Sequence, residues 1–168
     1  VGRYAVLTLH RPANVDDPGS LRGVLEPIVE LARRIPVVFP VHPRSREALA
    51  RAGWSPEAAP GLVLAEPLGY LDFLRLMMDA RVVATDSGGI QEETTILGVP
   101  CVTLRDNTER PITLTRGTNR LGGTRPEGIR RAIAEALERP PAPPDPVPLW
   151  DGRAAVRIAE ILARWAGV

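Results

Sequence analysis

The chain alternates short apolar runs with stretches whose apolar side chains recur at helical spacing, and this alternation restricts the fold more than any other feature. The apolar runs are YAVLTL, VVFPV, GLVLA, RVVAT, CVTLR and NRLGG, at residues 4–9, 37–41, 61–65, 81–85, 101–105 and 119–123. Helical stretches separate most of them, among them residues 19–34, 70–80 and 126–139. Regular alternation of strand and helix predicts a parallel sheet with helices on both faces. We therefore expect one three-layer, Rossmann-like α/β domain over residues 1–168, with about six parallel strands.

Residues 140–148 read PPAPPDPVP, a composition that excludes a helix interior or a central strand. We interpret this segment as an extended connector. The amphipathic sequence after it predicts a terminal helix within residues 150–168, and Asp151 is expected to cap its start. Pro27 is expected to kink or loosen the helix that it interrupts. The first expected strand begins within a few residues of Val1, which is typical of a domain taken from a longer chain.

Composition excludes several classes of function. The net charge of +1 gives no reason to expect broad binding to nucleic acid or to a membrane. All 21 basic residues are arginine, so neither a Schiff-base lysine nor a phosphate-loop lysine is present. Cys101 is the single cysteine and the histidines are His10 and His42, which is too few for a typical zinc site. With no signal peptide and no long apolar run, we expect a cytoplasmic protein.

The segment TDSGGIQEE, residues 85–93, ends one expected strand and begins a helix. Ligands bind at the carboxyl edge of open parallel sheets, and glycines there let a ligand approach the backbone. The N–H groups at the helix start suit a phosphate, and Ser87 adds a hydroxyl beside Gly88 and Gly89. One helical turn further on, Glu93 can accept hydrogen bonds from a vicinal diol such as a ribose. The segment therefore suits a nucleoside diphosphate.

Two other interpretations of this segment stay open at the level of local pattern. Ser, Asp and Gly before a helix, with Glu in its first turn, are also what helix capping alone selects. The letters DSGG also surround the nucleophile of chymotrypsin-like proteases, but that fold is all-β and the alternating pattern disfavours it. Neither a Gly-x-Gly-x-x-Gly dinucleotide fingerprint nor a Walker A motif occurs, so a usual nicotinamide or ATP site is not supported.

Polar side chains also follow three other expected strands. His10 and Arg11 follow the first, and a histidine there can donate to a phosphate or exchange a proton near neutral pH. His42 follows the second, and Arg110 lies in a long polar loop after the fifth. Each group alone could be an ordinary surface loop. Together they favour a binding site along one edge of the sheet.

These segments together resemble the C-terminal half of the non-hydrolysing bacterial UDP-N-acetylglucosamine 2-epimerases. The resemblance covers nearly the whole chain, through TLHRPANVDD, PVHPRSR, EPLGYLDFLRLM, TDSGGIQEETTILGVPCVTLRDNTERP, GTNRL and WDGRAAVRI. It implies the two-domain architecture of the glycosyltransferase-B enzymes, in which two Rossmann-like halves face each other across a cleft. One departure is Ala13, which stands where the family motif HRxEN has glutamate.

The resemblance also implies roles for individual residues. The implied catalytic residue is His10, near the diphosphate. The implied UDP-binding residues are Arg11, Ser87, Gly88, Gly89, Glu93, Glu92 and Arg110, with Glu93 preferred to Glu92 for the ribose. In some members, positions matching Arg11 and His42 help to bind a second, activating UDP-sugar. No metal and no cofactor is implied.

The reaction that the resemblance implies interconverts UDP-GlcNAc and UDP-ManNAc, by elimination of UDP to a 2-acetamidoglucal and its re-addition on the other face. The essential acidic residues of the family lie in the N-terminal half, so we expect the present chain alone to be inactive. Its expected partners are a UDP-sugar, the N-terminal domain and, in the full-length protein, a second copy in a homodimer. The alternatives are a glycosyltransferase-B-type UDP-sugar transferase domain and a non-catalytic nucleotide-sugar-binding module.

Overall fold

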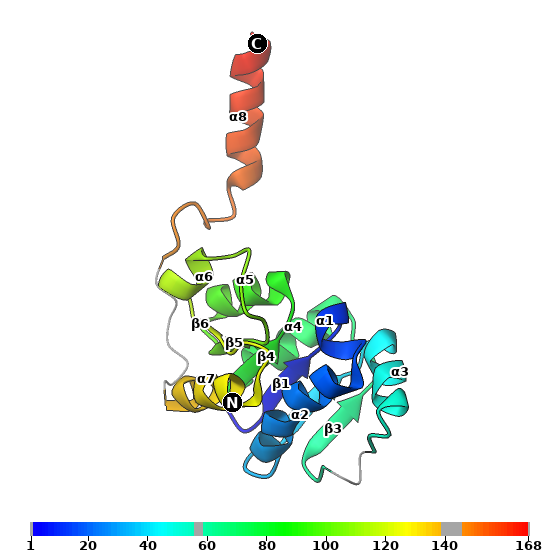
Figure 1. The fold of residues 1–168 in the computed structure, drawn as a ribbon. Helices are drawn as coiled ribbons and strands as arrows, with labels where there is room; N and C mark the ends of the chain where they lie inside the picture. The colour runs from blue at the N-terminus through cyan, green and yellow to red at the C-terminus, as the bar shows by residue number, and fades with distance from the viewer. Residues whose placement is uncertain (1, 56–58, 139–145, 168) are drawn as a thin grey trace.

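The computed structural model describes residues 2–55, 59–138 and 146–167. Its centre is one sheet of six strands, all paired in parallel, in the order β3-β2-β1-β4-β5-β6 (Figure 1). The strands are β1 (Ala5–Thr8), β2 (Val37–Pro40), β3 (Leu62–Ala65), β4 (Val82–Thr85), β5 (Cys101–Thr103) and β6 (Asn119–Leu121). All six lie in the apolar runs expected from the sequence, so the predicted parallel α/β fold is confirmed.

Helices connect the strands and continue beyond the last one. They are α1 (Pro12–Val15), α2 (Pro18–Ala32), α3 (Pro43–Arg51), α4 (Tyr70–Met78), α5 (Gly88–Leu97), α6 (Ile112–Thr115), α7 (Pro126–Glu138) and α8 (Ala154–Ala166). The α2 helix begins where the Asp17 carboxylate accepts a hydrogen bond from the Ser20 N–H at 2.7 Å. It continues through Pro27, which is buried.

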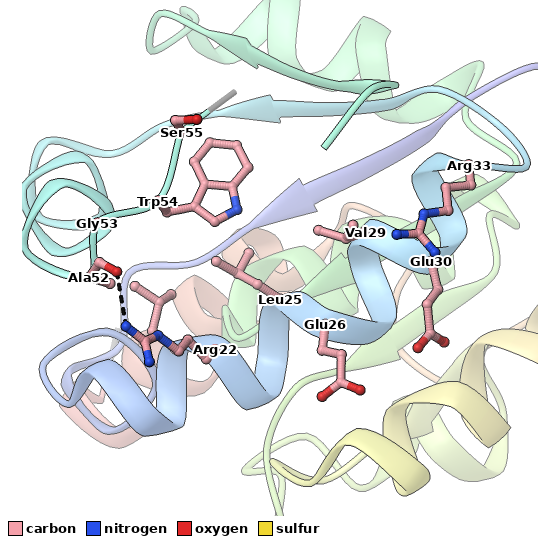
Figure 2. A pocket seen from close by; sticks show the side chains of 11 residues that line it. Arg22, Leu25, Glu26, Val29, Glu30, Arg33, Ala52, Gly53, Trp54 and Ser55 are labelled. Carbon is pink, nitrogen blue, oxygen red and sulfur yellow. Dashed lines mark hydrogen bonds between the residues drawn. The ribbon is translucent and has the colours of Figure 1, made fainter. Parts of the chain in front are cut away.

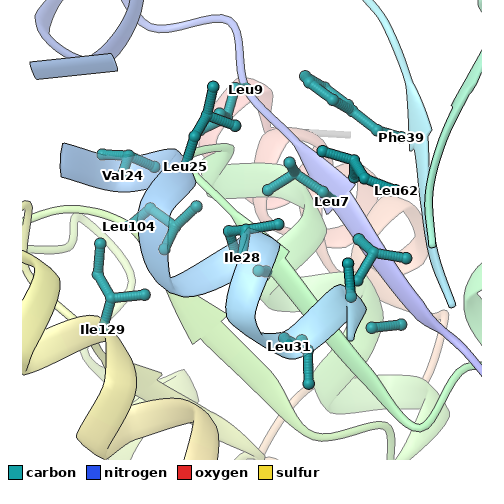
Figure 3. Close-up of a cluster of buried hydrophobic side chains, with 14 of the residues drawn as sticks. Leu7, Leu9, Val24, Leu25, Ile28, Leu31, Phe39, Leu62, Leu104 and Ile129 are labelled. Atoms are coloured by element: carbon teal, nitrogen blue, oxygen red, sulfur yellow. The ribbon is translucent and has the colours of Figure 1, made fainter. Parts of the chain in front are cut away.

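The pleat of the strands divides the core between the two faces of the sheet. On β1, Ala5 and Leu7 belong to one buried cluster and Val6 to another, because successive side chains point to opposite faces. The first cluster is completed mainly by α2, α3 and α7, and the second by α4, α5 and the residue Val99 that follows α5. Figure 3 shows Leu25 and Ile28 of α2 among the side chains of the first cluster. Helices on both faces give the three layers that were expected.

The strand order places a topological switch point between β1 and β4. From β1 the chain proceeds outward through β2 to β3, and then returns to β4 on the other side of β1. At such a point the connections leave the strand ends in opposite directions, which opens a crevice at the carboxyl edge of the sheet. The loops that begin at Leu9 and Asp86 meet at this edge.

The C-terminal part of the chain shows one difference from expectation. The helix begins at Ala154 with Arg153 as its N-cap residue, so the prediction that Asp151 is the cap was wrong. Gly152 has a φ of 75°, which turns the chain out of a helical path between Asp151 and the helix. The Asp151 carboxylate instead accepts hydrogen bonds from the Arg153 N–H at 3.0 Å and from Arg157.

The α8 helix has no buried residue, and Figure 1 shows it standing clear of the sheet. Its exposed apolar side chains include Val156, Ile161, Leu162 and Trp165. The connector predicted at 140–148 lies mostly outside the described residues, which resume at residue 146.

Candidate nucleotide-binding site

The loops after β1 and β4 are joined by a histidine and an aspartate. His10 Nδ1 lies 2.9 Å from Asp86 Oδ1; the His10 side chain is 40% exposed, whereas that of Asp86 is fully buried. A carboxylate can only accept a hydrogen bond, so Nδ1 carries the hydrogen in this contact. The other ring nitrogen, Nε2, is then left for a ligand. This is the arrangement by which a buried acid sets the tautomer and orientation of a functional histidine.

Asp86 also anchors the backbone of the first loop. Its carboxylate accepts hydrogen bonds from the backbone N–H groups of His10 and Arg11, the latter at 2.9 Å, and from Asn14 Nδ2 at 3.1 Å. Burial by itself would raise the pKa of Asp86. The hydrogen bonds from His10 and Arg11 outweigh that effect and hold the pKa below its usual value. Asp86 is therefore a buried anion that fixes the loop carrying His10.

Sequence reasoning missed Asp86, because it treated the aspartate as part of a helix-capping pattern. A signal was available: an ionisable residue directly after a fully buried strand needs a partner. The same reasoning assigned no role to Asn14, which is buried and also donates to the Leu104 carbonyl oxygen at 3.0 Å. These bonds connect the first loop to the ends of β4 and β5, while Ala13 beside Asn14 is exposed.

At the start of α5, the backbone of Gly88 and Gly89 is not covered by side chains of its own, and the Ser87 hydroxyl lies beside it. Ser87 is the N-cap residue, yet its side chain makes no capping hydrogen bond. Its N–H donates instead to Thr85 Oγ1 at 3.0 Å. A Cβ added at Gly89 would meet nothing within 4 Å, and one at Gly88 would come no closer than 3.9 Å to a Glu109 oxygen. Helix capping alone explains neither the uncommitted hydroxyl nor the two glycines.

His10, His42 and Ser87 line one hollow of about 210 Å³ above the ends of β1, β2 and β4. The rings of His10 and His42 lie 6.2 Å apart, centre to centre. Apolar side chains such as Phe73 and Ile90 complete the lining. The structure therefore brings together three of the residues that the sequence predicted for the site.

Arg11 follows His10 in the chain but does not line this hollow, and its side chain belongs to a group of charges. Its guanidinium is 3.8 Å from the Glu109 carboxylate, and Arg105 binds the same carboxylate through two contacts of 2.7 Å. The hydrogen bonds from Arg105 lower the pKa of Glu109 to about 2. The Glu109 carboxylate lies near Gly88 at the start of α5, and the two arginines paired with it give the group a net positive charge.

The two glutamates of α5 have different surroundings. Glu92 forms an ion pair with Arg110 at 3.0 Å, which joins the helix to the polar loop after β5. Glu93 is not part of the lining of the 210 Å³ hollow. Burial and the neighbouring Glu92 carboxylate raise the pKa of Glu93, and a hydrogen bond with Tyr70 offsets part of this rise. Glu93 therefore lies beside the α4 start rather than with His10 and Ser87.

A larger hollow of about 520 Å³ lies elsewhere, between α2 and the segment that follows α3 (Figure 2). Leu25 and Val29 line one side and Trp54 the other, and Arg22 donates to the Ala52 carbonyl oxygen at 3.2 Å. None of the site residues predicted from the sequence contributes to it. The polar groups of the candidate site instead converge at the strand ends.

Within the described part of the chain, no three His, Cys, Asp or Glu side chains gather closely enough to hold a metal ion. None of the helices in that part combines the length and the apolar character that crossing a membrane requires.

Comparison with known proteins identifies the family. A family model described as UDP-N-acetylglucosamine 2-epimerase matches residues 1–163. A UDP-N-acetylglucosamine 2-epimerase from Methanocaldococcus jannaschii is 39% identical over 95% of this chain and 44% of its own length. A UDP-2,3-diacetamido-2,3-dideoxy-D-glucuronate 2-epimerase from Pseudomonas aeruginosa is 37% identical over 96% of this chain and 44% of its own length.

A solved structure gives the same answer. The crystal structure of the M. jannaschii UDP-GlcNAc 2-epimerase in complex with UDP-GlcNAc and UDP matches with a TM-score of 0.86 and 38% identity. The match covers 98% of this chain and 46% of that one, so the present chain spans a little under half the length of its relatives. The chain belongs to the UDP-N-acetylglucosamine 2-epimerase family and corresponds to the C-terminal half of its members.

Proposed function

We propose that this chain is the UDP-binding half of a UDP-N-acetylglucosamine 2-epimerase that interconverts UDP-GlcNAc and UDP-ManNAc. One observation carries the proposal: His10, held by the buried Asp86, shares a hollow with Ser87 at the start of α5. The similarity to a structure that holds UDP-GlcNAc and UDP supports it. A cytoplasmic location is part of the same proposal.

The geometry suits the departure of UDP from the sugar. When the bond between C1 and the diphosphate breaks, negative charge grows on the oxygen of the β-phosphate. The N–H groups of Gly88 and Gly89 at the helix start and the Ser87 hydroxyl are donors held in place before the reaction. Nε2 of His10 and the Arg11 guanidinium add further donors at the same edge. Donors of this kind contribute about 3 kcal/mol each to transition-state stabilisation in other enzymes.

The roles of the remaining residues follow from their positions. Glu93 is proposed to accept hydrogen bonds from the ribose hydroxyls, with Glu92 tied to Arg110. His42, 6.2 Å from the His10 ring, and Arg11 are proposed to contact a second, activating UDP-sugar. The proposed scheme includes no cofactor and no metal. Elimination and re-addition involve no net oxidation or reduction of the substrate.

Turnover also requires acid and base groups at C2 of the sugar, and we propose that the N-terminal half supplies them. The exposed apolar side chains of α8, including Trp165 at 86% exposure, are proposed to pack against that half. The chain alone should then bind UDP without producing UDP-ManNAc, and a homodimer is proposed for the full-length protein. Proton NMR of UDP-GlcNAc incubated with the chain, and with the full-length protein, tests this division.

The family match favours an epimerase over the glycosyltransferase and over the non-catalytic binding module. The family match does not identify the sugar of the substrate, because the P. aeruginosa relative is named for a different UDP-sugar. Assaying the full-length protein with both UDP-sugars distinguishes the two epimerases, and turnover of neither would support the binding module.

Isothermal titration calorimetry of this chain with UDP tests the site. The His10→Ala and Glu93→Ala variants should each bind more weakly than the unmodified chain. Glu160→Ala is the matched control, because Glu160 is exposed on α8. Unchanged affinity in both site variants would refute the assignment of these residues.

A further inference from the structure

A buried polar network lies behind the proposed UDP site and centres on Gln91 of α5. Gln91 has no exposed surface. Its Nε2 donates to the Ser87 carbonyl oxygen at 3.1 Å, and its Oε1 accepts hydrogen bonds from Thr108 Oγ1 and from Asn119 Nδ2. One amide group therefore connects the first turn of α5, the loop after β5 and strand β6.

The network continues into the backbone of the loop. Thr108 Oγ1 accepts from the Arg110 N–H at 2.9 Å, and Thr113 Oγ1 donates to the Arg110 carbonyl oxygen at 2.7 Å. Asn119 Nδ2 donates to Thr113 Oγ1 at 3.1 Å. Both backbone polar groups of Arg110 are thus fixed by hydroxyls that themselves bond to Gln91 or Asn119.

Every group in this network has a determined direction. The Ser87 carbonyl can only accept, so the amide nitrogen of Gln91 must face it and the amide oxygen faces Thr108. Because that amide oxygen also only accepts, the Thr108 hydroxyl must donate to it while it accepts from the Arg110 N–H. The position requires a side chain that donates one hydrogen bond and accepts two at a single oxygen, as the Gln91 amide does. A carboxylate could not donate, and an apolar side chain could neither donate nor accept.

We propose that Gln91 is a positioning residue for UDP binding: it holds the Ser87 turn and the Thr108–Arg110 loop in a fixed relation, so that both can contact the same nucleotide. Gln91 does not contact the nucleotide itself, because it is buried beneath the turn. The inference rests on the proposed function, since it concerns the same site.

Gln91→Glu is the informative variant, because its protonation switches the pattern. A neutral glutamic acid can donate to the Ser87 carbonyl and accept from Thr108 and Asn119, as the amide does. The carboxylate cannot donate, and it faces the Ser87 carbonyl as a second acceptor. We expect the UDP dissociation constant of this variant, divided by that of the unmodified chain at the same pH, to be near 1 at low pH and to rise with pH.

A threonine pair tests the same network from the loop side. Thr108→Val removes the hydroxyl at nearly constant volume and should weaken UDP binding about threefold to tenfold, the effect of losing one hydrogen bond. Thr108→Ser keeps the hydroxyl and should restore most of the affinity. Thr115→Val is the control, because Thr115 is exposed on α6.

Isothermal titration calorimetry between pH 5 and pH 8 measures the UDP dissociation constant of each variant and of the unmodified chain. A ratio for Gln91→Glu that stays constant with pH, or a Thr108→Val variant that binds like Thr108→Ser, would overturn the inference while leaving the UDP site in place. If Gln91→Glu does not fold, the Thr108 pair decides alone. A chain that binds no UDP before any substitution would refute the proposed function and, with it, this role of Gln91.

Discussion

His10 Nδ1 and Asp86 Oδ1 lie 2.9 Å apart, although 76 residues separate them in the sequence. The contact is made where β1 and β4 pair side by side, at the switch point of the sheet. It couples a fully buried acid to a half-exposed histidine and gives the histidine one orientation. The same acid fixes the backbone from His10 to Arg11. The orientation of His10 and the backbone of the loop that carries it therefore depend on the Asp86 side chain.

Replacing Asp86 should destabilise the fold. The Asp86→Ala variant leaves the backbone N–H groups of His10 and Arg11 and the amide of Asn14 without their acceptor. Buried donors that lose a charged partner cost about 3 kcal/mol in total. Urea unfolding followed by circular dichroism measures the loss. Asp106→Ala, at an exposed aspartate, should change the free energy of unfolding by less than about 0.5 kcal/mol.

The lowered pKa of Asp86 predicts how stability changes in acid. An aspartate in the unfolded chain titrates near pH 3.9, and Asp86 in the folded chain titrates below that. Its contribution is therefore fully present above about pH 4 and is lost as the pH falls through the folded value. In urea unfolding between pH 2.5 and pH 5, the Asp86→Asn variant should show a shallower loss of stability than the unmodified chain. Equal slopes would mean that Asp86 does not have the lowered pKa.

Substitution of Gly89 at the start of α5 should affect UDP binding without destabilising the fold. A methyl group at Gly89 meets no protein atom, so Gly89→Ala should keep or raise the free energy of unfolding, by up to about 1 kcal/mol. The same methyl group would crowd a diphosphate seated on the backbone, and we expect UDP binding to weaken at least about fivefold. Gly23→Ala, in the interior of α2, should gain similar stability and bind UDP normally. Normal UDP binding by Gly89→Ala would contradict the proposed approach of the ligand.

Gly61 precedes β3 with a φ of 91°, and a Cβ there would run into the carbonyl oxygen of Ala32. Gly61→Ala combines backbone strain with a clash against backbone, and we expect a loss of about 3 kcal/mol or more. Gly53→Ala is the comparison, because its φ of 65° is also positive while its Cβ would meet nothing within 4 Å. Thermal unfolding should therefore rank Gly61→Ala well below Gly53→Ala. Similar midpoints would show that the close approach to Ala32 does not constrain the fold.

The fold class could be predicted because each strand can be identified from its own short apolar run. Val37 and Val82 begin short apolar runs bounded by polar or glycine-rich segments, and the intervening helices have their own period. The pairing of β1 with β4 could not be read in this way, since it depends on contacts between distant segments. For the same reason the sequence predicted His10 and Ser87 at one edge of the sheet, but it did not predict the Asp86 contact that positions His10.

The start of α8 was predicted wrongly from a local pattern, because a single backbone angle decides where that helix begins. Asp151 has the chemistry of an N-cap, but the positive φ of Gly152 moves the helix start to Ala154. At Ser87 the helix-capping alternative does not hold, because the side chain at this N-cap position makes no capping hydrogen bond. The position of Glu93 beside Tyr70, rather than among the residues lining the 210 Å³ hollow, depends on how α4 packs against α5.

Titration of the ¹⁵N-labelled chain with UDP, followed by heteronuclear NMR, tests most directly whether the nucleotide binds at the ends of β1 and β4. The backbone amides of His10, Ser87, Gly88 and Gly89 should show the largest shifts, while the indole N–H of Trp54 in the larger hollow stays unchanged. Shifts centred on Trp54 and α2, with the amides at the strand ends unmoved, would contradict the account.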